Sequence, residues 1–166
     1  MRCYILMGVS GCGKSSVGEA LSERVSMSFM DGDDLHPPSN IQKMASGQPL
    51  DDDDREPWLA KVGQSLAEAE GPVVIGCSAL KRKYRNWIRD AVGEPVHFMH
   101  LDAPKEVLAA RLAAREDHFM PASLLDSQFA ALENLEADEL GQRINIDRPL
   151  TDVVAQAETY VRETLA

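Results

Sequence analysis

The fold of this chain is decided by the stretch Tyr4-Ile5-Leu6-Met7-Gly8-Val9-Ser10-Gly11-Cys12-Gly13-Lys14-Ser15. It opens with an apolar run typical of a strand and continues as Gly-x-x-x-x-Gly-Lys-Ser, after which apolar residues recur at helical spacing. In such a loop, backbone N–H groups and the positive end of the helix can converge on phosphate oxygens, and glycines let the anion approach. The stretch therefore predicts a strand, a phosphate-binding loop and a helix; a glycine-rich turn with an exposed lysine is the alternative.

The residues of this loop have distinct expected roles. We expect Lys14 to bridge the β- and γ-phosphates of ATP and the Ser15 hydroxyl to face Mg²⁺. Cys12 is interpreted as a small filler residue, with redox sensing as the alternative. The residues expected to contact the nucleotide here are Gly8, Ser10, Gly11, Cys12, Gly13, Lys14, Ser15 and Ser16.

Further apolar runs follow at residues 28–30, 73–77, 96–101 and 143–146, each separated from the next by a helical pattern. This alternation predicts a parallel α/β sheet in a single domain spanning residues 1–166, since about 150 residues per domain is usual. Ser39 and Gln42 form a possible capping box, which predicts a short helix ending near Gly47.

Composition narrows the possible partners. The chain has 17 Lys and Arg against 27 Asp and Glu, a formal net charge of −10, which disfavours nucleic acid and acidic membranes. Its apolar runs are too short for a membrane span. The first run passes directly into the glycine loop with no cleavage site, so it is interpreted as a strand and not as a signal peptide. Three widely spaced cysteines, Cys3, Cys12 and Cys77, favour a reducing cytoplasm.

Other motifs distinguish among the proteins that carry such a loop. No Asn-Lys-x-Asp guanine motif is present, and the one Asp-x-x-Gly match begins at Asp90, at the end of a helical pattern. The third apolar run ends at Gly76-Cys77-Ser78, without the Asp-Glu pair of a motor ATPase. Transfer of a phosphoryl group to a small molecule is therefore favoured over a GTPase switch or a mechanical ATPase.

Carboxylates follow the second strand at Asp31 and Asp33, in the region where open α/β sheets bind ligands. One can orient an attacking hydroxyl and the other can hold Mg²⁺ through water, with Asp31 better placed for the metal. An acidic loop that caps the next helix is the alternative. Arg55 follows the acidic run that begins at Asp51, and an arginine beside a ligand cleft can bind a carboxylate or phosphate. Lys81 and Arg85 are expected to share a helix face and to bind an anionic substrate group together. Arg82 and Lys83 are expected to face solvent.

The sequence resembles the bacterial gluconate kinase family, within the group of shikimate and nucleoside monophosphate kinases. The resemblance spans nearly the whole chain and is carried by residues 6–15, 31–33, 36–44, 47–55, 77–81, 84–85 and 118–119. It implies a three-layer fold with helices on both faces of a sheet in strand order 2-3-1-4-5, a substrate-binding helical insertion at about 35–70 and a mobile lid at about 112–125. It also implies ATP-dependent phosphorylation of D-gluconate at the 6-hydroxyl and a homodimer.

The resemblance assigns roles residue by residue. Asp33 would orient the hydroxyl, Asp31 would reach Mg²⁺ through water, and Arg115 in the lid would stabilise the developing charge. The remaining assignments are Arg55, Lys81 and Arg85 for the gluconate carboxylate and hydroxyls, His36 and Asn40 for the polyol, and Arg111 and Pro149 for the adenine side. A kinase for another aldonate or for shikimate, and a nucleotide-binding regulatory module without catalysis, are the alternatives.

Overall fold

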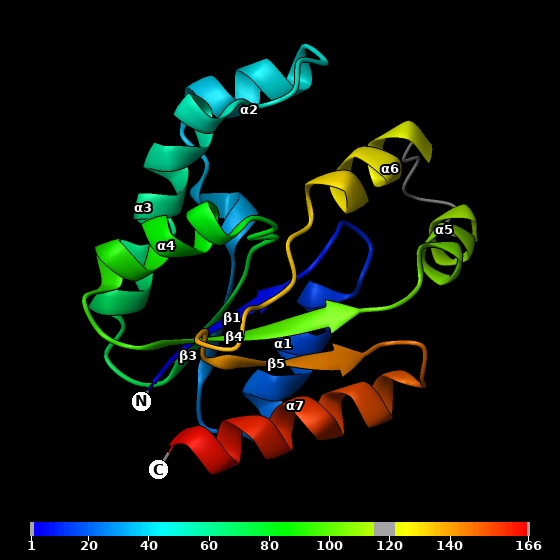
Figure 1. Ribbon diagram of the computed structural model, residues 1–166. Helices are drawn as coiled ribbons and strands as arrows, with labels where there is room; N and C mark the ends of the chain where they lie inside the picture. The colour runs from blue at the N-terminus through cyan, green and yellow to red at the C-terminus, as the bar shows by residue number, and fades with distance from the viewer. Residues whose placement is uncertain (1, 115–121, 166) are drawn as a thin grey trace.

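The computed structural model describes residues 2–114 and 122–165, and its centre is a parallel sheet (Figure 1). The strands are β1 (Cys3–Met7), β2 (Ser28–Asp31), β3 (Val73–Gly76), β4 (Val96–Asp102) and β5 (Gly141–Asn145). Their order is β2-β3-β1-β4-β5, and every neighbouring pair is parallel, which confirms the predicted topology. The last strand begins and ends slightly earlier than its apolar pattern predicted.

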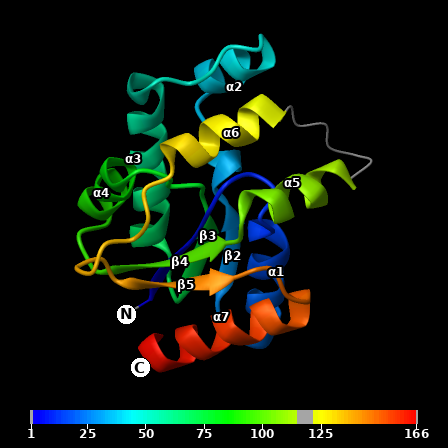
Figure 2. The ribbon, with the colours of Figure 1, turned by 45° about the vertical axis from the view of Figure 1, so that its right-hand side comes forward.

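Helices cover both faces of this sheet (Figure 2). They are α1 (Lys14–Arg24), α2 (Pro38–Ala45), α3 (Asp52–Glu68), α4 (Arg82–Val92), α5 (Lys105–Ala113), α6 (Ala122–Ala131) and α7 (Leu150–Leu165), with a 3₁₀ turn η1 (Gly32–Leu35). Because side chains alternate along a strand, Tyr4 and Leu6 of β1 pack with α1 and α7, whereas Ile5 and Met7 pack with α3 and α4. This central strand is buried on both faces, which explains its unbroken apolar run.

Two helix starts differ from each other in how they are capped. Helix α2 begins at Pro38 and has no side-chain cap, so the predicted capping box at Ser39 is wrong. Proline suits the first helical position because the N–H it lacks would have no partner there. The box occurs instead at α3, where Asp51 and Asp54 each accept from the backbone N–H of the other. Asp51 and Asp54 of the acidic run therefore serve the helix start.

The carboxyl ends of the strands meet at one edge of the sheet, where two groups of helices rise on either side. Helices α2 and α3 lie between β2 and β3 in sequence, and α5 and α6 follow β4. Residues 115–121 of the expected lid, including Arg115, lie outside the described residues. None of the helices in the described part of the chain has the length and apolar character of a membrane span.

Candidate functional site

The glycine loop between β1 and α1 is shaped to receive an anion. Gly13 caps α1 in a left-handed conformation with φ 95°, and a Cβ on Gly8 would lie 2.6 Å from the Leu101 carbonyl oxygen, so both positions need glycine. The first N–H groups of α1 have no intrahelical acceptor, and they carry the positive end of the helix dipole. The loop therefore presents unpaired donors at the carboxyl edge of the sheet.

Lys14 folds over this loop. Its Nζ donates to the carbonyl oxygens of Gly8 at 2.9 Å and Val9 at 3.2 Å, and it lies 3.7 Å from the Cys12 Sγ. Because Lys14 is bound, within the described part of the chain, only to groups of the loop itself, its ammonium group can exchange these bonds for a bound phosphate. Cys12 is buried, in agreement with a filler residue.

Ser15 at the start of α1 meets Asp31 at the end of β2. The Ser15 Oγ lies 3.5 Å from Asp31 Oδ2, while Asp31 Oδ1 accepts from the Asp33 backbone N–H at 3.0 Å. Hydroxyl and carboxylate oxygens fit Mg²⁺, which keeps several waters and takes only one or two protein ligands beside substrate phosphates. No group of three or more His, Cys, Asp or Glu that could hold a metal occurs within residues 2–114 and 122–165. The pair fits a magnesium ion that is bound mainly through a nucleotide.

Asp33 projects from η1 with 80% of its side chain exposed. Partial desolvation by the surrounding protein raises the pKa of the Asp33 carboxyl group above its ordinary value, and the neighbouring Asp31 carboxylate raises it further. Lys14 and His36 oppose the rise. Water still reaches the carboxyl group, because most of the side chain is exposed.

His36 and Asn40 follow η1 in the chain and pack beside it. The His36 side chain is only 6% exposed and stacks on Trp58, with ring centroids 4.0 Å apart. The Asn40 amide nitrogen donates to His36 Nδ1 at 3.2 Å and to the Asp54 carbonyl oxygen at 3.0 Å, so both of its hydrogens have protein acceptors. Trp58 in turn donates to the Gly32 carbonyl oxygen at 2.8 Å. The structure thus places the two predicted polyol ligands as buried supports for the Asp33 turn, a role that the sequence did not reveal.

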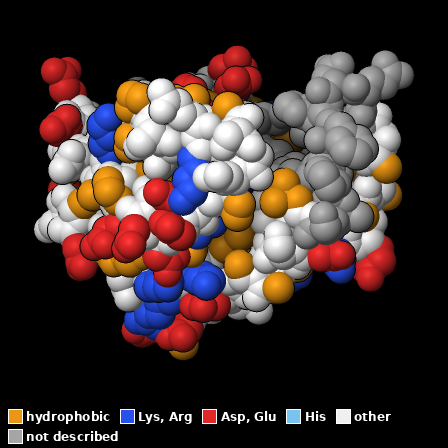
Figure 3. Space-filling model, turned by 90° about the horizontal axis from the view of Figure 1, so that it is seen from above, with side chains coloured by type: hydrophobic (Ala, Val, Ile, Leu, Met, Phe, Trp, Pro, Cys, Tyr) orange, Lys and Arg blue, Asp and Glu red, His pale blue; other side chains and the backbone are white. Residues whose placement is uncertain are grey.

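A cationic cluster forms where α3 meets the start of α4. The Arg55 guanidinium lies 5.4 Å from the centroid of the Tyr84 ring and the Lys81 Nζ lies 5.9 Å from it. Arg55 also donates to the Tyr84 hydroxyl at 3.2 Å, and that hydroxyl donates to Asp52 at 2.7 Å. Burial and the Asp52 hydrogen bond raise the pKa of Tyr84 to about 12. Acidic and basic side chains accordingly lie next to one another on the face seen from above (Figure 3). Tyr84 holds Arg55 in place, although the sequence pattern assigned it no role.

Arg85 does not belong to this cluster, and its surroundings do not support the predicted contact with substrate. Its side chain is 0% exposed, and it donates to Glu139 through Nε at 2.7 Å and to the Ala79 carbonyl oxygen at 2.9 Å. Although burial opposes ionisation, hydrogen bonds from Arg85 and Arg89 hold the pKa of Glu139 below its ordinary value. Lys81 lies in extended conformation just before α4, so the expected shared helix face does not exist. Arg82 and Lys83 form ion pairs at the surface, with Asp138 and Asp52 respectively.

A cavity of about 360 Å³ adjoins the glycine loop on the other side. Arg111 lines it and donates to the Ile146 carbonyl oxygen, and Arg148 and Leu150, the sequence neighbours of Pro149, also line it. Gly11, Cys12, Gly13 and Ser16 line the same cavity. The structure therefore brings Arg111, predicted for the adenine side, to the same cavity as residues of the phosphate loop. Ser10, at the outer turn of the loop, contacts Gln128 of α6.

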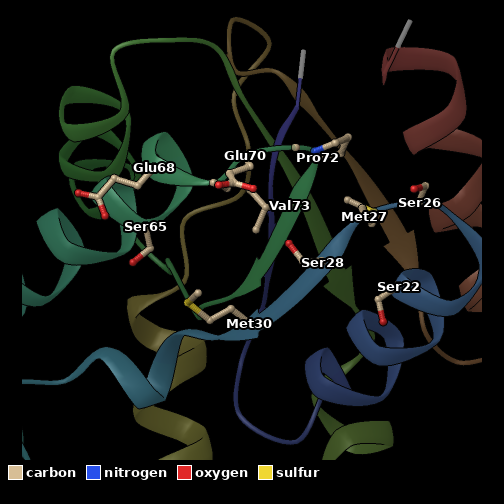
Figure 4. Close-up of a pocket in the computed structure, with 12 residues that line it drawn as sticks. Ser22, Ser26, Met27, Ser28, Met30, Ser65, Glu68, Glu70, Pro72 and Val73 are labelled. Atoms are coloured by element: carbon tan, nitrogen blue, oxygen red, sulfur yellow. The ribbon is translucent and has the colours of Figure 1, made fainter.

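A second hollow, of about 790 Å³, lies elsewhere in the fold (Figure 4). It runs along the edge strand β2 and is lined by serines, glutamates and Met30, from the end of α1, the end of α3 and the segment before β3. No residue of the glycine loop lines it. It is therefore separate from the candidate active site.

Comparison with known proteins agrees with this geometry. Residues 4–135 match a family described as an AAA domain. The chain is 45% identical over 163 residues to the thermosensitive gluconokinase of Escherichia coli (strain K12), covering 95% of this chain and 86% of that protein. It is 50% identical over 143 residues to the gluconokinase of Gluconobacter oxydans (strain 621H), covering 83% and 79%. The crystal structure of a gluconokinase from Sinorhizobium meliloti 1021 matches with a TM-score of 0.89 at 44% identity, covering 98% and 92%. Together with the phosphate loop and the Ser15–Asp31 pair, these similarities show that the chain belongs to the gluconokinase family.

Proposed function

We propose that this protein transfers the γ-phosphoryl group of ATP to the 6-hydroxyl of D-gluconate, giving ADP and 6-phospho-D-gluconate. The observation that carries the proposal is that the glycine loop, the Ser15–Asp31 pair and the Asp33 carboxylate meet at one edge of the sheet. The other support is membership of the gluconokinase family.

In this reaction the loop residues hold the phosphates while Asp33 acts on the acceptor. Lys14 and the first N–H groups of α1 would spread the charge on the β- and γ-phosphates, as phosphoryl transfer mainly requires. The Asp33 carboxylate would orient the 6-hydroxyl and accept its proton as the new O–P bond forms and the bond to ADP breaks. Ser15 and, through water, Asp31 would hold Mg²⁺, which when bound neutralises phosphate charge.

Binding of the two substrates falls to opposite sides of the loop. Arg55 and Lys81 would bind the gluconate carboxylate and hydroxyls, since both cations lie around the Tyr84 ring. Arg111 and Pro149 would border the adenine, and Arg115 would stabilise the transferred group. We further expect a homodimer that works in the cytoplasm. The resemblance to gluconate kinases supports the dimer, and three buried, unpaired cysteines support the reducing compartment.

The test is ADP release from Mg-ATP in the presence of D-gluconate, other aldonates, shikimate or nucleoside monophosphates. We expect release with D-gluconate and a product phosphorylated at the 6-position. Release with another acid instead would identify a related small-molecule kinase. If the protein binds ATP but releases no ADP with any of these acceptors, the proposal is contradicted and a regulatory module is favoured.

A further inference from the structure

Among the described residues, the hydrogen bonds that join helix α6 to the phosphate loop come from one side chain, that of Gln128. Its Oε1 accepts from the Ser10 backbone N–H at 2.6 Å, and its Nε2 donates to the Ser10 Oγ at 2.9 Å. Both residues are half-buried. The two bonds run in opposite senses between the same two residues, so they fix the orientation of the amide group as well as its distance.

Ser10 occupies a part of the loop that has little other backbone support. Beside Ser10, the described residues provide backbone bonds only from the Gly8 N–H to the Ser78 carbonyl oxygen and from the Cys12 N–H to the Val9 carbonyl oxygen. The following Gly11 has a positive φ of 83°, which few other residues adopt. Lys14 bonds to the Gly8 and Val9 carbonyl oxygens from within the loop, and Gln128 adds two hydrogen bonds to Ser10 from outside it.

The Gln128 oxygen has two possible effects on nucleotide binding. It could compete with a phosphate oxygen for the N–H groups of the loop, or it could hold the loop in the shape that binds phosphate. The N–H groups expected to bind phosphate are those at the start of α1, which have no intrahelical acceptor. Gln128 bonds to Ser10, which precedes that helix by four positions, and leaves those donors unoccupied. We infer that Gln128 is a positioning residue that holds Ser10 and so keeps the phosphate loop in its nucleotide-binding shape. The nucleotide class rests on the proposed function.

The test compares Gln128→Ala and Gln128→Met with the native protein, because methionine keeps the length of the side chain without its amide. Dissociation constants for ATP and ADP are measured by calorimetry without acceptor, and KM for each substrate is measured where turnover is present. We expect both variants to raise the nucleotide dissociation constants roughly 5- to 100-fold, the change that two lost hydrogen bonds make. KM for ATP should rise in parallel, with KM for gluconate unchanged.

Two further variants separate positioning from folding. Ser127→Ala lies next to Gln128 on α6 and removes an exposed hydroxyl that bonds within its own helix, so nucleotide affinity should stay native. Ser10→Ala removes the acceptor of Nε2, so it should weaken nucleotide binding in the native background and add little to Gln128→Ala. This variant also serves if Gln128→Ala does not fold.

Native or tighter nucleotide binding in Gln128→Met would overturn the inference, since the amide would then be irrelevant or competing. A fall in Tm with unchanged nucleotide affinity would also overturn it, as evidence of a purely structural contact. Weaker nucleotide binding in a protein that phosphorylates no gluconate would uphold the inference while refuting the proposed function.

Discussion

Replacing Arg85 with alanine should destabilise the protein without affecting how it binds gluconate. The guanidinium is fully buried and holds both oxygens of the equally buried Glu139 carboxylate, at 2.7 and 3.0 Å. Removing Arg85 leaves the buried Glu139 carboxylate with Arg89 as its remaining hydrogen-bonded cation, and breaking a buried ion pair costs up to about 3–5 kcal/mol. For a chain of this length each kcal/mol lowers Tm by about 2–4 °C, so Tm should fall by up to roughly 6–20 °C.

The assay is urea and thermal unfolding, followed by tryptophan fluorescence, together with KM for gluconate at a temperature where the variant is folded. Arg82→Ala, on the same helix but in a surface ion pair, is the matched control and should change Tm much less. Arg85→Ala combined with Glu139→Ala should cost less than the two separate changes added together, because the contact between these two side chains is then lost only once. Native stability with a raised KM for gluconate would refute this reasoning and return Arg85 to the substrate site.

Three other predictions follow from the site. Lys14→Ala and Asp33→Asn should each lower kcat by orders of magnitude with Tm nearly unchanged, and near-native turnover would remove the affected residue from the mechanism. Tyr84→Phe frees Arg55 from the tyrosine hydroxyl, so KM for gluconate should rise about 2- to 20-fold with KM for ATP unchanged; equal rises in both would contradict a role at the acceptor site. Burial lowers the pKa of His36, so its contribution to stability is present above the ordinary value near 6.5 and is lost as pH falls toward the lower folded value. The free energy of unfolding should therefore fall less steeply between pH 7 and 5 in His36→Phe than in the native protein, and identical slopes would rule this contribution out.

Local sequence predicted the elements that depend on near neighbours. The run that ends at Met7 and the glycines that follow specify β1 and the loop, because apolar character and backbone freedom act within a few residues. The pairing of Ser15 with Asp31 was also predictable, since both follow the carboxyl ends of parallel strands. At α2 the prediction of the helix start failed by two positions, because the helix begins at Pro38 with Pro37 as its N-cap and Ser39 lies inside it.

The roles of polar side chains in the site depended on partners far away in sequence. The sequence predicts the same role for Arg55 and Arg85, that of cations near a cleft. In the structure Arg55 lies in the cluster around Tyr84, whereas Arg85 is buried against Glu139, 54 residues further along the chain. Gln128 forms a hydrogen bond with Ser10, which lies 118 residues away in the chain, and no pattern in the sequence predicts this contact.

The sequence by itself thus determined the alternation of strands and helices, the phosphate loop and, through its resemblance to gluconate kinases, the chemistry to expect. Only the tertiary structure decided which charged and amide groups are free to bind a ligand and which are bonded to other protein groups. The physical reason is that backbone conformation responds to local periodicity, whereas the state of a charged side chain is set by burial and by the partner that burial requires.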